Sequence, residues 1–223
     1  MKENRMVGML IKIARLMKRI LRRSIDFLLY YRYAFGFRYL YVKNYFKKIR
    51  NNRSKSFLFW VPGGMSLLLH VEGAIATALR LRGHQVHAII CDGAYKACIR
   101  REITDGISIE DWPKICTECI ASTTQVLQQM GVPFSYIGDY VSKTEINEAR
   151  QLAKNAQWST IEELAYNDLL IGKNVKSAIL RYLRGQSEPT DIRIVEEYAF
   201  SGFITAIASK NAYNSIKPNQ IYM

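Results

Sequence analysis

The feature that most constrains the fold is a strand–turn–helix–strand pattern between residues 57 and 90. Residues 57–61 are a short apolar run that is typical of a buried strand, and Pro62-Gly63-Gly64 interrupts it. Residues 71–81 have helical spacing, Gly83 ends that helix, and residues 85–90 form a second apolar run. This order, within about 35 residues, is that of a βαβ unit with two parallel strands. The sequence therefore predicts an α/β, Rossmann-like parallel sheet flanked by helices.

Further patterns extend this unit to the end of the chain. We expect a looser, cysteine-bearing section at 94–120, a helix at 123–130, a strand at 133–137, helices at about 144–154, 159–184 and 190–215, and a strand from 220 onward. The predicted domain organisation is therefore a basic, aromatic-rich arm over residues 1–55 and a Rossmann-like body over residues 56–223.

Charge separates the arm from the body. Residues 1–56 hold 16 Lys/Arg against two acids, a net charge of +14, whereas the remaining residues hold 16 Lys/Arg and 17 Asp/Glu, a net charge of −1. A nucleic-acid-binding body would carry its basic face on the folded domain, so no nucleic-acid partner is predicted for the body. The asymmetry indicates instead a surface interaction made by the arm, with a membrane or with RNA.

The arm favours the membrane. On a helical projection of residues 6–23, six cations share one arc and the apolar side chains fill the opposite side, and tyrosines and phenylalanines follow at 30–46. A basic amphipathic helix with interfacial aromatics is typical of a peripheral contact with anionic lipid, here through residues 1–50. Two alternatives stay open: a helix that covers a partner domain, and an organelle-targeting presequence.

The expected location is the cytoplasm, peripheral to the inner face of a membrane. No uncharged apolar run is long enough for a membrane-spanning helix, and the basic residues of the arm interrupt any secretory signal. Four cysteines without an export signal are expected to be thiols or metal ligands in a reducing compartment.

Two loops are candidate ligand sites because ligands of parallel sheets collect beyond the carboxyl ends of the strands. They are residues 62–72 and 91–98, where Gly63, Gly64 and Gly93 allow close backbone approach to a substrate. The first loop lacks the spacing of a dinucleotide fingerprint, and the chain has no Walker A sequence.

Several of these segments resemble the opening of GT-B glycosyltransferases, above all those of capsule and surface polysaccharide biosynthesis. The segments are Val61-Pro62-Gly63-Gly64, His70-Val71-Glu72, Leu81-Arg82-Gly83-His84-Gln85-Val86, Cys91-Asp92-Gly93 with Cys98, Cys116 and Cys119, and Ile171-Gly172-Lys173-Asn174-Val175 with Ser177 and Arg181-Tyr182. The resemblance covers roughly residues 57–223 and leaves out the arm.

This resemblance implies two Rossmann-like domains that face each other across a cleft. The chain would be the acceptor-side domain of an enzyme that transfers a sugar from a nucleotide-sugar donor to a surface polysaccharide or lipid-linked acceptor. The donor-binding domain would follow residue 223 or belong to a separate subunit. The alternative is a noncatalytic, membrane-associated binding module with a zinc-stabilised cysteine loop.

Two sets of side chains are candidates for chemistry. Cys91, Cys98, Cys116 and Cys119 could close a tetrahedral structural zinc site, and the alternative is that Cys91 and Cys98 are small core residues. Glu72, His70 and Asp92 are candidate catalytic residues, since an acceptor hydroxyl must lose a proton to a carboxylate or imidazole. The structural alternative for Glu72 is an acid that favours the dipole at a helix N-terminus.

Overall fold

The computed structural model describes residues 54–62, 66–98, 100 and 111–223. The chain divides into two compact units, Met1–Lys48 and Ile49–Met223. Residues 1–53 of the basic arm, with its predicted amphipathic helix, lie outside the described residues, and so do Gly63 and Gly64. All of the described residues belong to the second unit.

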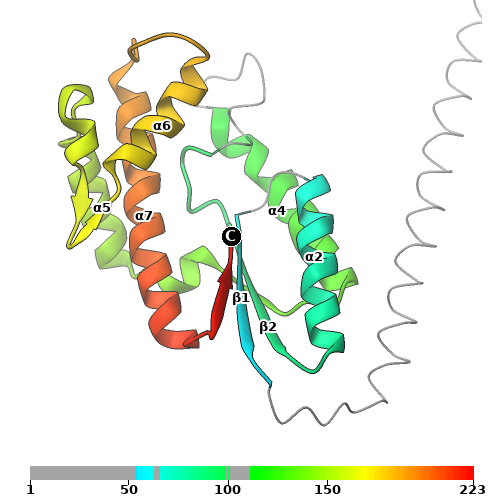
Figure 1. The fold of residues 1–223 in the computed structure, drawn as a ribbon. Helices are drawn as coiled ribbons and strands as arrows, with labels where there is room; N and C mark the ends of the chain where they lie inside the picture. The colour runs from blue at the N-terminus through cyan, green and yellow to red at the C-terminus, as the bar shows by residue number, and fades with distance from the viewer. Residues whose placement is uncertain (1–53, 63–65, 99, 101–110) are drawn as a thin grey trace, which may run out of the picture. The chain divides into compact units, whose positions relative to one another are not determined.

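A four-stranded sheet forms the centre of this unit (Figure 1). Its strands are β1 (Ser56–Val61), β2 (Gln85–Ile90), β3 (Phe134–Tyr136) and β6 (Gln220–Tyr222). They lie in the order β3-β2-β1-β6, and each neighbouring pair is parallel. The predicted α/β fold with a parallel sheet flanked by helices is thereby confirmed.

Helices α2 (Ser66–Leu81) and α4 (Trp112–Gln129) cover one face of the sheet. Phe59 and Val61 of β1 point to this face and pack with apolar residues of both helices. The alternate residues of the strand, Leu58 and Trp60, point to the opposite face, because side chains alternate along a strand. Both faces are buried, which explains why β1 is apolar from Phe57 onward and why β2 is apolar except at Gln85 and His87.

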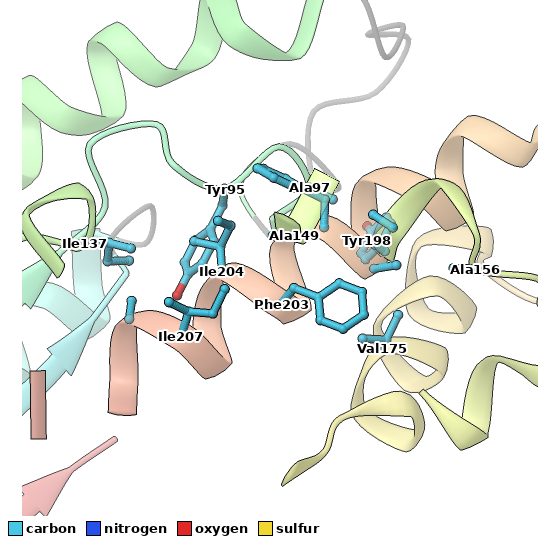
Figure 2. Packing of buried hydrophobic residues seen from close by; sticks show 14 of the residues in the cluster. Tyr95, Ala97, Ile137, Ala149, Ala156, Val175, Tyr198, Phe203, Ile204 and Ile207 are labelled. Carbon is cyan, nitrogen blue, oxygen red and sulfur yellow. The ribbon is translucent and has the colours of Figure 1, made fainter. Parts of the chain in front are cut away.

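The opposite face carries α5 (Lys143–Lys154), α6 (Gly172–Leu183) and α7 (Ile192–Ile216) (Figure 1). Helix α7 contributes the largest share of this core and is buried along much of its length. Figure 2 shows Tyr95, from the loop after β2, beside Ile204 of α7, and Phe203 beside Val175 of α6. The helix pair α6–α7 and the loop after β2 thus share one core.

Three predicted boundaries are wrong. Helix α2 begins at Ser66, before the predicted 71, so most of the supposed 62–72 loop is helical. Helix α4 begins at Trp112 and includes the last third, residues 112–120, of the section predicted to be loose. The predicted helix at 159–184 is broken into the 3-10 helix η3 (Trp158–Glu163), the hairpin β4 (Ala165–Tyr166) and β5 (Leu169–Leu170), and then α6.

The reason for this break lies in the hairpin turn. Asn167 has a φ of 50°, a left-handed conformation that ends any helix and that Asn tolerates better than most residues. Gly172 then starts α6 against the backbone carbonyls of Ile161 and Glu162, where a Cβ would overlap them. Helical periodicity in the sequence could not reveal a close approach between two backbones.

Candidate ligand pocket

A cavity of about 810 Å³ lies beyond the carboxyl ends of β1 and β2. Its wall comes from the end of β1, the loop after β2, the first half of α4, one side of α6, one side of α7 and the β4–β5 hairpin. Ligands of open parallel sheets bind at this edge, and small-molecule pockets usually enclose roughly 300–1,000 Å³. Position and size are therefore those of a small-molecule site.

The loop after β2 is fastened to α7 by one hydroxyl. Ser201 Oγ accepts hydrogen bonds from the backbone N–H groups of Lys96 (3.1 Å) and Ala97 (2.9 Å) and donates one to the carbonyl of Glu197 (2.9 Å). Ser201 is buried, so the two loop amides depend on its oxygen as an acceptor. The hydroxyl thus fixes the loop that forms one wall of the pocket.

A second polar chain crosses the same wall. The Tyr95 hydroxyl is hydrogen-bonded to the side chains of Thr205 and Trp60, and burial raises the pKa of Tyr95 well above its usual value of 10. Thr205 Oγ1 donates to the carbonyl of Ser201 (2.8 Å), which leaves its oxygen free to accept from Tyr95. The Trp60 indole can only donate, so the order of donation is Trp60 to Tyr95 to Thr205. These buried polar groups satisfy one another.

The rest of the wall is apolar or small. Helix α7 presents Ser201, Gly202, Thr205, Ala206 and Ser209, which follow helical spacing along one side. Because these side chains are short, the space between α7 and α4 stays open to a ligand. The remaining lining is largely aliphatic, aromatic or thiol, for example Trp60, Ile115, Ile120, Leu169, Val175 and Met223.

The charged residues of the described lining are Arg100 and Arg181, and the described lining includes neither Asp nor Glu. Arg181 lies on the side of α6 that also presents Asn174 and Ala178 to the cavity. Arg100 is near α4, where its charge lowers the pKa of Cys119, although burial of that thiol is the larger influence and raises it. The described wall is therefore apolar with two cations.

All four cysteines of the chain line this pocket: Cys91 and Cys98 in the loop after β2, and Cys116 and Cys119 on α4. They are half-buried free thiols, and burial raises the pKa of Cys91 and of Cys119. Among the described residues, which include all four, no group of three or more His, Cys, Asp or Glu side chains is arranged to hold a metal ion. The four cysteines thus line one pocket, and the zinc site predicted from their spacing stays a prediction.

The predicted catalytic and substrate-binding residues lie in several places. Gly93 lines the pocket with a φ of 91°. Asp92 does not line it, and its Oδ1 accepts a hydrogen bond from the Ala94 N–H (3.3 Å) within the same turn. His70 and Glu72 lie on α2, outside the pocket lining, and burial raises the pKa of Glu72. Their roles as bases stay predictions.

Sequence reasoning missed Trp60, Tyr95 and Ser201, and it used Arg181 only in the family resemblance. Trp60 and Tyr95 flank the two turns that the strand pattern identifies, so their place at strand ends was an available signal. Ser201 had a weaker signal, as a polar residue inside the apolar stretch of α7. Nothing in the local sequence of Arg181 separates it from other helix-surface cations.

Comparison with known proteins gives few matches. No family model matches the chain, and no curated protein matches it. Among solved structures, the chain is similar to a CDPS (cyclodipeptide synthase) from Fluoribacter dumoffii, with 15% identity over 75% of this chain and 76% of that one and a TM-score of 0.45. A likeness at this level carries no inference about what the chain binds or does.

The resemblance to GT-B glycosyltransferases, and the sugar-transfer function drawn from it, is wrong: no glycosyltransferase family model and no curated glycosyltransferase matches the chain, and the solved structure named above is a CDPS. Its main motif has a structural explanation. Gly83 has a φ of 85° at the end of α2, and His84 accepts a hydrogen bond from the Lys55 N–H (3.2 Å) and packs on Phe57. The Arg82-Gly83-His84 step is thus a helix ending before a strand, a connection that parallel α/β folds have in common. The alternative, a noncatalytic module with a zinc-stabilised loop, finds no support either.

Proposed function

We propose that the body of this chain is a small-molecule-binding domain that holds a largely apolar organic ligand in the pocket beyond β1 and β2. The observation that carries the proposal is the cavity of about 810 Å³, walled by apolar and short side chains, with its buried polar groups already hydrogen-bonded. An apolar ligand surface would replace water there without leaving a polar group of the protein without a hydrogen-bond partner. The proposal is one of binding and includes no reaction.

The test blocks the pocket from a position that the fold does not need. Asn174 is exposed on α6 and lines the cavity, whereas the neighbouring Lys173 is exposed and does not. A neutral apolar dye, N-phenyl-1-naphthylamine, should bind the wild type with enhanced fluorescence. Asn174→Trp should weaken this binding at least about tenfold, and Lys173→Trp should leave it unchanged.

A second readout uses the cysteines. Because all four line the pocket, their alkylation reports on that space alone. Saturating dye should slow the reaction of the thiols with iodoacetamide in the wild type and in Lys173→Trp. Dye binding that is equal in both tryptophan variants, or that leaves every thiol as reactive as before, would refute the pocket as the binding site.

We further propose that the arm brings this domain to an anionic membrane surface, in keeping with a cytoplasmic, peripheral location. The support is the net charge of +14 over residues 1–56 and the separation of cations from apolar residues within 6–23. Within the described residues, no helix has the length and apolarity that crossing a bilayer requires. In flotation with phosphatidylserine vesicles, the full chain should bind, and replacing Lys12, Arg15, Lys18 and Arg19 by Gln should release it. Equal flotation of both would contradict the arm as the contact.

A further inference from the structure

We infer that one side of helix α2 is a second membrane contact, which inserts into the boundary between the headgroups and acyl chains of the bilayer that the arm binds. This contact surface, here called the α2 outer face, consists of Leu67, Leu68, Val71 and Ile75. The inference extends the proposed membrane contact from the arm to the body and rests on that proposal.

The α2 outer face is apolar where a helix that covers a sheet is usually polar. Its four side chains are 75%, 51%, 49% and 36% exposed, in sequence order. Leu67, Val71 and Ile75 are four residues apart and therefore form one row along the helix. The opposite side of α2 packs on the sheet, for example through Leu69 and Ala76. A surface helix normally carries charged and polar residues on its outer side, so large apolar side chains there indicate a further contact.

No other helix of the described residues exposes a comparable group. Helix α5 exposes one large apolar side chain, Ile146, and α6 exposes Leu180. Helix α7 exposes two, Ile192 and Tyr213, which lie near its opposite ends. Single exposed apolar side chains are normal on a protein surface, whereas a contiguous group marks a contact surface.

The charge of this region favours an anionic lipid surface as the partner. The exposed positions of α2 from Leu67 to the end of the helix hold neither Asp nor Glu. The acid of this helix, Glu72, is half-buried, and burial raises its pKa, which favours the neutral form. Peripheral membrane binding combines electrostatic attraction with apolar burial. The arm supplies the charge, +14 over residues 1–56, and the α2 outer face supplies the apolar surface.

The arm joins the body beside the end of this helix. The Lys55 N–H donates to His84 Nδ1 (3.2 Å), and the Gln85 N–H donates to the Lys55 carbonyl (2.9 Å), just after α2 ends at Leu81. The start of β1 and the end of α2 thus lie at the same end of the sheet (Figure 1). At a rise of 1.5 Å per residue, the α2 outer face begins roughly 10 Å from that end and extends to roughly 20 Å. One membrane can therefore meet both the arm and α2.

The first experiment measures binding of the full chain to vesicles of equal parts phosphatidylserine and phosphatidylcholine. Leu67→Gln/Val71→Gln should lower the vesicle affinity at least about tenfold, because it removes apolar surface that the bilayer would bury. The matched control, Ile146→Gln/Ile192→Gln, changes two exposed apolar side chains on the opposite face of the sheet and should keep the wild-type affinity. Unchanged thermal midpoints would show that both variants are folded, as expected for exposed side chains.

Two further readouts separate apolar insertion from attraction by charge. The ratio of wild-type to Leu67→Gln/Val71→Gln affinity should stay the same as salt rises, whereas both affinities fall, because salt screens charges and not apolar contacts. In vesicles that contain brominated phosphatidylcholine, Val71→Trp should lose more tryptophan fluorescence than the wild type, since bromine quenches an indole that it touches. Ile192→Trp should lose no more than the wild type.

The outcomes distinguish this inference from the proposal on which it rests. If the full chain does not bind the vesicles, the membrane proposal itself fails. If it binds but the two double variants have equal affinities, or Val71→Trp is quenched no more than the wild type, the α2 contact is overturned and the arm contact stands. Stronger vesicle binding by Leu67→Gln/Val71→Gln would overturn the inference too, because the arm would then cover α2. So would a lipid-free dimer that this variant converts to a monomer in light scattering, because the face would then be an interface between two copies.

Discussion

Replacing Ser201 with Ala should remove the hydrogen bonds that hold the loop after β2, one wall of the pocket, against α7. The hydroxyl accepts hydrogen bonds from the Lys96 and Ala97 N–H groups, and Ala offers no acceptor. A buried N–H left without a partner costs roughly 1–3 kcal/mol, with less for Lys96, whose bond is only partly buried. Ala is a better helix former than Ser by about 0.5 kcal/mol. The expected net loss in the free energy of unfolding is roughly 2–3 kcal/mol.

The assay is urea unfolding followed by circular dichroism, with Ser209→Ala as the matched control. Ser209 lies on the same helix and lines the same pocket, but its hydroxyl donates to the Ala206 carbonyl within the helix (3.1 Å). Losing that bond should change stability by no more than about 0.5 kcal/mol. Alkylation followed by mass spectrometry should show faster modification of Cys91 and Cys98, in the loop, than in the wild type.

A loss in Ser201→Ala that is no larger than in Ser209→Ala would refute this reasoning. So would a full loss of stability without any change in the reactivity of the two loop cysteines, because the effect would then lie within the helices alone. Ser201→Thr keeps the acceptor oxygen and should recover much of the loss if its added methyl group finds space beside the loop.

Three further results are expected. The Ser142 backbone N–H lowers the pKa of Glu145 from its usual 4.5. In urea unfolding, the wild type should therefore have a higher free energy of unfolding than Glu145→Gln at neutral pH, and the difference should shrink as the pH falls below 4.5. Gly172→Ala should destabilise the protein by about 1–3 kcal/mol in the same assay, because its Cβ would overlap two backbone carbonyls of η3. Leu69→Ala should lower the free energy of unfolding by about 2–5 kcal/mol, since the Leu69 side chain is 3% exposed. Leu67 is 75% exposed, so Leu67→Ala should lower it by less than about 0.5 kcal/mol. Equal losses would contradict the helix face assigned to the core.

The sheet could be predicted from sequence because its signals are local. The two apolar runs, Gly83 between them and the short run at 134–136 each depend on neighbouring residues, and the structure confirms the parallel arrangement. The hairpin before α6 could not be predicted in this way. Its turn at Asn167 interrupts a sequence with helical composition, and the place of Gly172 is set by a carbonyl that belongs to a different element.

The position of the pocket could be predicted only in part. The rule that ligands collect at strand ends led to the loop at 91–98, which lines the pocket, but it also led to Gly63, Gly64, His70 and Glu72 as its companions. The last two lie on α2, outside the pocket lining. The other wall comes from α6 and α7, and contacts such as that of Ser201 with Lys96 join residues 105 positions apart. Such pairs leave no periodic trace in a single sequence.

The cysteines show what spacing can and cannot establish. The four cysteines line one pocket, but their spacing does not tell whether they are thiolates that bind a cation or thiols in an apolar wall. Burial raises the pKa of Cys91 and of Cys119, whereas a bound metal ion would hold the same thiols deprotonated at neutral pH.

Iodoacetamide reacts with the thiolate, so the pH profile of its reaction decides between these cases. With residue-resolved mass spectrometry, the rates at Cys91 and Cys119 should be far below that of a free cysteine peptide at about pH 7 and should still rise beyond about pH 9. The urea-unfolded chain is the control and should show the ordinary thiol profile at both positions. A plateau reached below about pH 8 in the folded protein would mean that a nearby cation stabilises the thiolates. In that case the pocket wall would be charged where the proposed ligand needs it to be apolar, and the binding proposal would fall with it.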